Sequence, residues 1–402
     1  MNVLFIAPRL PLPADTGGKI RTFNIIKQIA KRDNLDLVCF SFEQNDESYL
    51  KDFDALGIRA RLVPVEEPGL GYKVKTVLSD QRPFSAVKYC TDQMRESIEE
   101  LIKGAKYDMV YVDHIHMAHY QSCFKQVPCI VDEHNVEYRI LERCANVEKN
   151  FLKAWVYQGQ AEKMKRFEVT KVLEFSACSA VSEDDARLLR NLVQNQVPIH
   201  VIQNGVDTEF FRQRATGNGL GEDALVFTGS MDWLPNDDAM KFFVQDVLPL
   251  VWQKSEDTKL YVVGKGPSLE LKQLAEKDKR VVVTGRVDDV RPYMDKAKVF
   301  ITPLRIGGGT RLKILEAMSM QKAVVSTSIG AEGINCQDGK DILLADAPKE
   351  FADKVLMLLD DPQKRESLGV AGRQLVLEKY DWNIVGEKLD KICRNMVHTN
   401  AA

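Results

Sequence analysis

Residues suited to binding phosphate gather in the segment Arg305–Met320, RIGGGTRLKILEAMSM, which follows a short apolar run. Its glycines open a stretch of helical periodicity, and the free backbone amides at a helix start bind phosphate groups. Arg311 and Lys313 fall in the first turn, where cations oppose the helix dipole and therefore need an anionic partner. We predict that this partner is a diphosphate. The residues predicted to contact it are Gly307, Gly308, Gly309, Thr310, Arg311 and Lys313.

Glu316 follows one turn further along the same predicted helix. Its two carboxylate oxygens can accept hydrogen bonds from both hydroxyls of a ribose, as a carboxylate does in dinucleotide-binding folds. The alternative is an ordinary solvated glutamate on a helix surface. We predict the ribose contact, which makes the predicted ligand a nucleotide.

A second candidate phosphate site is the segment Pro8–Arg21, PRLPLPADTGGKIR, which lies between the first apolar run and a helix predicted to begin near Ile20. Gly17 and Gly18 would let a ligand approach the backbone closely at that helix start. The segment lacks the GxGxxG spacing of dinucleotide sites, so a surface loop is the alternative. We predict that both glycines contact the ligand.

Two histidines, His114 in YVDHIH and His134 in VDEHNVEYR, each follow an apolar run. A neutral imidazole at a strand end can donate a hydrogen bond to a hydroxyl group, and Asp113, Asp132 and Glu133 are close enough in sequence to orient it. The alternative for each histidine is a hydrogen bond within the following turn. We predict that His134 takes part in the chemistry.

A metal site is the competing interpretation of His114, His116 and His119. Neither a cysteine nor a carboxylate completes a recognisable ligand spacing around them. Asp52 and Asp54 in DFD are also a weak metal signal, because they do not follow a strand, and we interpret them as a solvated helix face. The sequence therefore predicts no metal site.

The segment Thr228–Phe243, TGSMDWLPNDDAMKFF, places Gly229 and Ser230 at the end of another apolar run. A small residue and a hydroxyl at this position can meet a phosphate group. Asn236 has the chemistry of a helix N-cap, and acidic residues follow it in the first turn, so part of the segment is structural. We predict that Gly229 and Ser230 bind the nucleotide.

Short runs rich in valine and isoleucine alternate with longer segments of helical periodicity along the chain. This alternation is typical of parallel sheets with helices on both faces, whose ligands bind beyond the carboxyl ends of the strands. The strands predicted for a first sheet are Val3–Ala7, Leu35–Phe42, Arg61–Val65, Met109–Val112, Cys129–Val131, Phe175–Val181 and His200–Ile202. The strands predicted for a second sheet are Leu225–Gly229, Leu260–Gly264, Val281–Gly285, Val299–Pro303, Ala323–Thr327 and Ile342–Ala345.

The segment Gln203–Ala224 interrupts both periodicities with glycines and charges, which suits a linker. The 402 residues are enough for two domains of roughly 200 residues each. We predict an α/β protein with two Rossmann-like, doubly wound parallel-sheet domains, residues 1–204 and 205–381, that face a shared cleft. An amphipathic helix at 382–397 is expected to pack back onto the first domain.

Composition argues against several classes of protein. The 55 Lys and Arg against 58 Asp and Glu give a formal net charge of −3, so no general positive field exists to hold nucleic acid. The eight cysteines form no CxxC pair or regular framework, as expected of free thiols in the cytoplasm. The start of the chain lacks an export signal, and no apolar run approaches the roughly 20 residues of a membrane span. We expect a cytoplasmic protein whose membrane contact, if any, is peripheral.

Taken together, these motifs resemble the retaining GT-B glycosyltransferases, the family 4-like group that includes sucrose synthases and bacterial lipopolysaccharide and exopolysaccharide sugar transferases. The resemblance runs nearly end to end. It implies transfer of a sugar from a nucleotide diphosphate donor to an acceptor, with retention of configuration and without a metal or other cofactor. The first domain would then bind the acceptor and the second the nucleotide sugar. The motifs that carry it are Gly17-Gly18, VIQNGVDTEFF, the strand ends at Gly264 and Gly285, GGGTRLKILEAM, and YDW at Tyr380–Trp382.

The chain departs from the family in its donor motif, which has two glutamates separated by seven residues. Glu316 matches the second, the one associated with the ribose, whereas Gly308 stands in place of the first. Backbone amides of the glycine loop would then make the contacts to the donor sugar. Arg286, directly after the strand end at Gly285, is a further candidate for binding the donor.

A second departure concerns cations. The family usually has an Arg and a Lys after the first strand of the second domain, near Ser230 and Asn236 here, and both are absent. Arg311 and Lys313 are therefore the residues expected to stabilise the leaving diphosphate. With His134 they are the predicted catalytic residues.

Other functions remain open on the same architecture, because a fold does not determine chemistry. A nucleotide-sugar epimerase needs no acceptor, and a phosphorylase of the familiar kind needs a pyridoxal lysine. A non-catalytic nucleotide-sugar-binding protein would be consistent with Gly308 and the missing cations. An NAD-dependent oxidoreductase is disfavoured, since neither half has GxGxxG followed by an acid roughly 20 residues later.

The resemblance leaves a glycan, a lipid-linked molecule or a small molecule as the acceptor, with cell-surface polysaccharide or glycolipid synthesis as the expected role. A lysine-rich helix predicted over Val147–Lys171 could lie near an anionic membrane, and a solvated surface is the alternative. The membrane interpretation requires four apolar side chains of this helix to be exposed. These are Phe151, Leu152, Trp155 and Val156.

Overall fold

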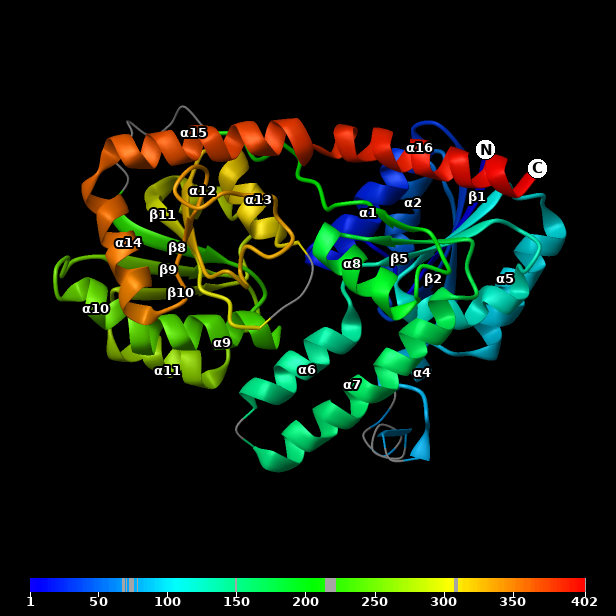
Figure 1. Cartoon of the computed structure of the whole chain (residues 1–402), viewed down its shortest axis with the longest axis horizontal. Helices are drawn as coiled ribbons and strands as arrows, with labels where there is room; N and C mark the ends of the chain where they lie inside the picture. Colours follow the sequence, from blue (N-terminus) through cyan, green and yellow to red (C-terminus); the bar gives the residue numbers. More distant parts are fainter. Residues whose placement is uncertain are drawn as a thin grey trace. The chain divides into compact units, whose positions relative to one another are not determined.

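The computed structural model describes residues 1–66, 69, 71, 76–77, 79–148, 150–213, 222–306 and 310–401. They form two compact units, each built around its own sheet (Figure 1). Unit 1 comprises Met1–Gln203 together with Val385–Ala402, and unit 2 comprises Asn204–Ile384.

Unit 1 contains a seven-stranded sheet in the order β3-β2-β1-β4-β5-β6-β7, with neighbouring strands parallel. This is the Rossmann order, which reverses direction between β1 and β4 and opens a ligand-binding crevice there. Every strand predicted for the first sheet is present. The strands are β1 Asn2–Ala7, β2 Asn34–Ser41, β3 Arg59–Pro64, β4 Met109–Asp113, β5 Cys129–Glu133, β6 Ala177–Ala180 and β7 Ile199–Val201.

Helices connect these strands, and two short 3-10 segments, η1 Asp46–Tyr49 and η2 Ile115–Cys123, follow β2 and β4. The helices that the structure describes in unit 1 before the carboxyl-terminal segment are α1 Gly17–Ala30, α2 Leu50–Asp54, α4 Phe84–Val87, α5 Asp92–Gly104, α6 Glu137–Val147, α7 Phe151–Val172 and α8 Glu183–Leu192.

Two helix predictions in unit 1 were wrong in their boundaries. Helix α1 begins at Gly17 instead of near Ile20, so the two glycines form its first turn and are not part of a loop. The helix predicted over Val147–Lys171 is two helices, because α6 ends at Val147 and α7 begins after Asn150. The Asn150 side chain caps α7 by accepting hydrogen bonds from the backbone amides of the next turn.

Unit 2 contains a six-stranded parallel sheet in the order β10-β9-β8-β11-β12-β13. This is again the Rossmann order, and it reverses between β8 and β11. All strands predicted for the second sheet are present, so the predicted fold class is confirmed. The strands are β8 Glu222–Thr228, β9 Lys259–Val263, β10 Val281–Gly285, β11 Ala297–Thr302, β12 Ala323–Ser326 and β13 Leu343–Leu344.

The helices described in unit 2 connect its strands and then follow the last strand. They are α9 Leu234–Phe242, the π-helical turn η3 Phe243–Val247, α10 Leu248–Trp252, α11 Leu269–Lys277, α12 Arg291–Lys296, α13 Leu312–Ser319, α14 Pro348–Asp360 and α15 Pro362–Lys379.

Two predictions in unit 2 need correction. Trp233, not Asn236, occupies the N-cap position of α9, so the helix starts three residues earlier than this prediction, with Pro235 in its first turn. Proline is tolerated there because the backbone amides of a first helical turn have no partner within the helix, so the amide hydrogen that proline lacks is not needed. The predicted linker Gln203–Ala224 is also too long, since β8 already begins at Glu222.

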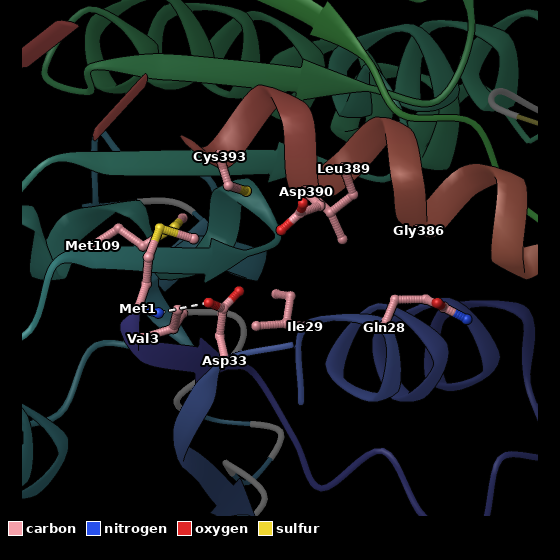
Figure 2. Close-up of a pocket in the computed structure, with 10 residues that line it drawn as sticks. All are labelled: Met1, Val3, Gln28, Ile29, Asp33, Met109, Gly386, Leu389, Asp390 and Cys393. Atoms are coloured by element: carbon pink, nitrogen blue, oxygen red, sulfur yellow. Dashed lines mark hydrogen bonds and ion pairs between the residues drawn. The ribbon is translucent and has the colours of Figure 1, made fainter. Parts of the chain in front are cut away.

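Helix α16, Trp382–Ala401, ends the described chain, and its residues from Val385 onward belong to unit 1. Figure 2 shows this helix beside β1 and α1, with Gly386 near Gln28 and the buried Cys393 near Met109. The Arg394 guanidinium donates to an Asp33 carboxylate oxygen at 3.2 Å. Apolar packing and this ion pair together hold the helix on unit 1.

Candidate functional site

The carboxyl end of β8 in unit 2 carries an amine that the neighbouring helix α13 supplies. Lys313 Nζ donates to Asn236 Oδ1 at 2.7 Å and lies 3.9 Å from the ring centroid of Phe227. Gly229 leaves the space for it, because a Cβ there would lie 2.6 Å from Nζ, and its φ of +154° also favours glycine. The ammonium group therefore lies at the strand end where Rossmann sheets bind their ligands.

Asn236 fixes the position of this amine. Its side-chain Nδ2 donates to the backbone carbonyl of Ser230 at 2.8 Å while its Oδ1 accepts from Lys313. The amide thus connects the turn after β8 to α13. Asn236 lies where the sequence comparison placed a missing family cation, and it binds the cation that α13 provides instead.

Two ionisable groups of α13 have pKa values shifted towards neutrality. Burial, together with the nearby Arg311, lowers the pKa of Lys313 to about 7, although Glu316 opposes the shift. Burial raises the pKa of Glu316 to about 7, against the effect of Lys313. A buried amine that loses part of its charge at neutral pH will regain it when an anion binds beside it. Strongly shifted groups of this kind are concentrated at functional sites.

The other predicted residues of this segment lie around α13. Arg311 is partly buried at the N-cap position of the helix, and Glu316 is partly buried one turn into it. Thr310 is buried, and its hydroxyl donates to the backbone carbonyl of Gly333 at 3.3 Å. The predicted contacts of Gly307, Gly308 and Gly309 lie outside the described residues.

Arg286 lies apart from this cluster within the same unit. It is exposed and directly follows β10, which is separated from β8 by β9 in the sheet. Its predicted role in donor binding stays a prediction.

The equivalent strand ends of unit 1 carry a buried network of charged groups. Asp113 ends β4 and Asp132 lies next to the end of β5, directly opposite it in the sheet register. His134 Nε2 lies 2.8 Å from Asp113 Oδ1 and 3.5 Å from Asp132 Oδ2. The predicted orientation of His134 by these two aspartates is therefore present.

Three partners of the aspartates were missed in the sequence. Arg21 donates two hydrogen bonds to Asp132, from Nε at 3.0 Å and Nη2 at 2.8 Å, and both side chains are buried. Ser179 donates to the same carboxylate at 2.7 Å, and Thr22 donates to Asp113 at 2.8 Å. Arg21 and Thr22 lie one turn into α1 after its glycines, which was the available signal for them. Ser179 pairs with Asp132 across β5 and β6, a relationship visible only once the sheet order is known.

His134 carries a positive charge at neutral pH, contrary to the neutral imidazole assumed from the sequence. Burial alone would favour the neutral ring, but the carboxylates of Asp113 and Asp132 raise the pKa of His134 to about 9. With Nε2 directed at Asp113, its Nδ1 faces Gly18, where a Cβ would lie 4.0 Å away. The imidazolium can therefore donate a hydrogen bond toward the first turn of α1.

His114 lies against His134 in a different charge state. The two ring centroids are 3.6 Å apart, and burial together with the positive His134 holds the pKa of His114 well below its usual range. His114 has a φ of +67°, a backbone conformation that is rare for a non-glycine residue. Residues held in such conformations cluster at functional sites. Gly18 lies over both rings, so a side chain at Gly18 would fill the space above them.

Glu133 does not orient either histidine, so that prediction was wrong. Successive residues of a strand point to opposite faces of the sheet, and Glu133 therefore points away from the face of Asp132. Both of its carboxylate oxygens are buried and lack a hydrogen-bond partner among the described residues. Burial and the nearby Glu168 raise the pKa of Glu133 well above its usual range.

Two groups of side chains have the composition of a metal site, which revises part of the sequence interpretation. His114 and His116 lie close to the carboxylate of Glu137, and His114 and His134 lie close to Asp113. A carboxylate thus completes each group, although its sequence spacing gave no sign of this. His119 is not part of either group, since its Nε2 contacts the backbone carbonyl of Tyr89 at 3.0 Å.

Comparison with known sequences identifies the family of the chain. The sequence model described as "Glycosyltransferase Family 4" matches residues 15–210, and the one described as "Glycosyl transferases group 1" matches residues 222–361. The chain belongs to the family 4-like glycosyltransferases. The family predicted from the glycine-rich motif is confirmed, and the enzyme transfers sugar from a nucleotide-sugar donor.

Relatives of this glycosyltransferase include an uncharacterised 44.6 kDa protein in the cps region of Klebsiella pneumoniae. It is 21% identical over 394 residues, which cover 94% of this chain and 96% of that protein. The phosphatidyl-myo-inositol mannosyltransferase of Mycobacterium tuberculosis is 27% identical over 211 residues, which cover 50% of this chain and 55% of that enzyme. The match to the mannosyltransferase thus spans about half of its length.

Solved structures show the same GT-B fold. The glycosyltransferase has a TM-score of 0.71 and 14% identity with Anabaena HepE in complex with UDP and glucose, over 98% of this chain and 100% of that one. Sucrose-phosphate synthase from Thermosynechococcus elongatus gives a TM-score of 0.75 and 15% identity, over 99% of this chain and 100% of that one. At this level of identity the likeness concerns the fold.

Proposed function

We propose that this glycosyltransferase transfers a sugar with retention of configuration, that unit 2 binds the nucleotide-sugar donor, and that unit 1 binds the acceptor. The position of Lys313 at the end of β8, held by Asn236 over Gly229, is the observation that carries the donor assignment. The amine of Lys313, largely removed from water, lies at the switch point of the sheet. A diphosphate is the ligand whose charge suits it.

In the proposed mechanism, unit 2 stabilises the leaving nucleoside diphosphate. The amides that open α13 and the charges of Arg311 and Lys313 would offset the negative charge that grows on the diphosphate as the glycosidic bond breaks. Glu316, one turn further along, would accept hydrogen bonds from the ribose hydroxyls. The transferred sugar would contact the backbone of the glycine segment, where the family has a glutamate and this chain has Gly308.

In unit 1, His134 is the group proposed to contact the substrates. Its imidazolium is fixed by Asp113 and donates from Nδ1 toward the space above Gly18. A charged donor at that position would hold a sugar hydroxyl or a phosphate oxygen. Asp132 stays ionised, because the Arg21 guanidinium holds its pKa well below the usual range against the effect of burial. The network thus keeps the imidazolium in one orientation.

Retention follows in the proposal from attack by the acceptor on the face of the sugar from which the diphosphate leaves. The enzyme would then mainly position the reactants and stabilise charge, without a nucleophilic side chain. The proposed catalytic residues fit this description, since Arg311, Lys313 and His134 are all charge-stabilising groups. The same cations would make a metal unnecessary for the leaving group.

We further propose a lipid-linked acceptor at the cytoplasmic face of a membrane, in cell-surface polysaccharide or glycolipid synthesis. Two relatives support this: the Klebsiella protein comes from the cps region, and the mycobacterial mannosyltransferase carries phosphatidyl-myo-inositol in its name. None of the described helices combines the length and apolarity needed to cross a bilayer. The proposed membrane contact is therefore a peripheral one.

The direct test incubates the purified chain with UDP-, GDP- and ADP-linked α-sugars, and with octyl glycosides and short-chain phosphatidylinositol as acceptors. Mass spectrometry detects the product, and the coupling of its anomeric proton gives its configuration. Transfer to an α-linked product that persists in EDTA supports the proposal. A β-linked product contradicts retention, an epimerised donor identifies an epimerase, and binding without turnover identifies a binding protein. The Lys313→Met variant, expected to have strongly reduced turnover, serves as the matched control.

A further inference from the structure

The tip of the α6–α7 hairpin carries apolar side chains that no described part of unit 1 covers. The two helices lie side by side, and the hairpin extends away from the sheet (Figure 1). Phe151 is 79% exposed, Leu152 69% and Trp155 65%. They are three of the four most exposed large apolar side chains among the described residues, and the fourth, Leu269, lies in unit 2.

These side chains form one continuous stripe on α7. An α-helix turns by about 100° per residue, so Phe151, Leu152, Trp155 and Val156 lie within about 140° of one another around the helix. Val156, at the edge of the stripe, is 37% exposed. Further along α7, the same side of the helix carries Arg166 and other polar residues. The apolar surface is therefore confined to the first two turns, which are the hairpin tip.

The rest of the hairpin is packed and fixed, so the exposure is not a consequence of a loosely held helix. The opposite side of α7 buries Ala161 and Met164. The carboxylate of Glu168, also buried on α7, accepts a hydrogen bond from the backbone amide of Glu137 at 2.6 Å and thereby caps α6. The apolar stripe is therefore exposed on a helix whose opposite side is packed against the rest of unit 1.

Basic residues lie close to the apolar stripe in the sequence. Between Glu142 and Glu162 the sequence contains three basic residues and one acidic residue, within a chain whose formal net charge is −3. Lys153 is exposed on α7, between Leu152 and Trp155 in sequence. Aromatic side chains with basic neighbours are the composition of helices that lie in the headgroup region of a bilayer. Anionic lipids attract such basic residues at close range.

We propose that the α6–α7 tip inserts Phe151, Leu152 and Trp155 into an anionic lipid surface and anchors the enzyme there. The inference deepens the proposed function by naming the surface that would bring the enzyme to a lipid-linked acceptor. A second copy of the chain is a poorer occupant. Aromatic side chains bury roughly 150–250 Å² each, so Phe151 and Trp155 from both copies would contribute about 600–1,000 Å², which is below the roughly 1,200 Å² of a stable interface between proteins.

The test measures co-sedimentation of the full chain with vesicles of phosphatidylcholine, with and without phosphatidylglycerol. We expect binding to the anionic vesicles, and a loss of about tenfold or more in the variant with both Phe151→Ser and Trp155→Ser. Leu269→Ser, equally exposed in unit 2, is the matched control and should bind as the unchanged chain does. Absence of binding by the unchanged chain, or a double variant within twofold of it, overturns the proposal.

A second measurement locates the contact without weakening it. Tryptophan fluorescence of the unchanged chain should shift to shorter wavelength with anionic vesicles, and Trp155→Phe should bind the vesicles but lose the shift. A retained shift in Trp155→Phe contradicts insertion of the tip. A dimer in vesicle-free buffer that the double variant abolishes would instead identify a second copy as the occupant. Transfer to a water-soluble octyl glycoside, measured in parallel, separates failure of the anchor from failure of the proposed sugar transfer.

Discussion

Lys313 of helix α13 lies 2.7 Å from the side-chain oxygen of Asn236, in the space that Gly229 leaves at the end of β8. Lys313 is more than 70 positions away from Gly229 and Asn236 in the sequence. The three residues nevertheless lie together at the switch point of the second sheet. The family that the chain resembles usually has cations after β8, whereas here Asn236 in the first turn of α9 binds a cation from α13. In the proposed donor site, α13 therefore supplies the phosphate-binding charge.

The titration of Lys313 and Glu316 predicts how donor binding depends on pH. Both groups have a pKa of about 7 in the unliganded enzyme. Above this pH Lys313 becomes neutral and attracts the diphosphate less, and below it Glu316 becomes neutral and accepts ribose hydrogen bonds less well. The affinity for a nucleotide sugar should therefore be highest near pH 7 and fall on both sides. Calorimetry with UDP-glucose or GDP-mannose from pH 5.5 to 9 measures the profile.

Substitutions show which residue causes the decline in affinity on each side of this pH profile. Lys313→Arg keeps a permanent charge, so it should remove the decline at high pH, and Glu316→Gln should remove the decline at low pH. A profile that stays flat in the unchanged enzyme, or one that neither substitution alters, would show that these groups do not contact the donor.

Removing the charge of Glu316 should weaken nucleotide binding without damaging the fold. Glu316→Gln keeps the size of a partly buried side chain, and its effect on the free energy of unfolding should be within about 1 kcal/mol. The affinity for UDP or GDP should fall about tenfold, since a carboxylate accepts hydrogen bonds more strongly than an amide. Glu276→Gln on α11, which is exposed, is the matched control. An unchanged affinity would contradict the ribose contact.

The pKa of His134 predicts a pH-dependent contribution to stability. The folded-state pKa of about 9 lies above the ordinary value of 6.5, so the imidazolium stabilises the folded state fully below pH 6.5. This contribution, on the order of 3 kcal/mol for a buried group, is lost as the pH rises from 6.5 through 9. His134→Gln should flatten that part of the stability curve. Denaturant unfolding at pH 6 and pH 9 gives the comparison, and an equal pH dependence in the variant would show that His134 is neutral.

Glu133 predicts a second pH-dependent contribution to stability, and here the charged form of the side chain is the one that the fold disfavours. Its pKa is raised well above the ordinary value, so ionisation is disfavoured in the folded state and the folded state loses stability as the pH rises above that value. Glu133→Gln removes the ionisation and should raise the free energy of unfolding at pH 8 by about 1–3 kcal/mol, with little effect at pH 5. Thermal unfolding at both pH values tests this. Destabilisation at pH 8 would mean that the carboxylate has a favourable partner.

The sequence predicted the sheets well and the buried network poorly, for physical reasons. The strands are nearly continuous runs of buried apolar residues such as those of β1, and that pattern is local. Arg21, by contrast, donates a hydrogen bond to Asp132, which is 111 positions away in the sequence. Judged from the sequence alone, each of these residues could equally be a solvated charge on the surface. Ser179 lies in a strand whose other residues are apolar and gave no sign of a role. Such partners become apparent only when the strand order is known.

Helix boundaries illustrate the same limit on a smaller scale. Asn236 has the residue type of an N-cap, but α9 has its N-cap three residues earlier, at Trp233. The side-chain amide of Asn236 is therefore available to bind Lys313. The charge state of His134 was also inaccessible, since it depends on two carboxylates that the sheet register brings beside it. The predicted phosphate-binding cation, in contrast, followed from local helix electrostatics and needed no tertiary information.

The central claim is that Lys313 and Arg311 stabilise the leaving diphosphate, and steady-state kinetics on Lys313→Met and Arg311→Ala tests it most directly. Charge on the leaving group is greater in the transition state than in the bound donor, so kcat should fall more than donor affinity. We predict a loss of about a hundredfold in kcat for each variant, about 3 kcal/mol of transition-state stabilisation. Lys254→Met, an exposed lysine between α10 and β9, should retain full turnover. Near-normal kcat in both site variants, with folding verified by circular dichroism, would contradict the account.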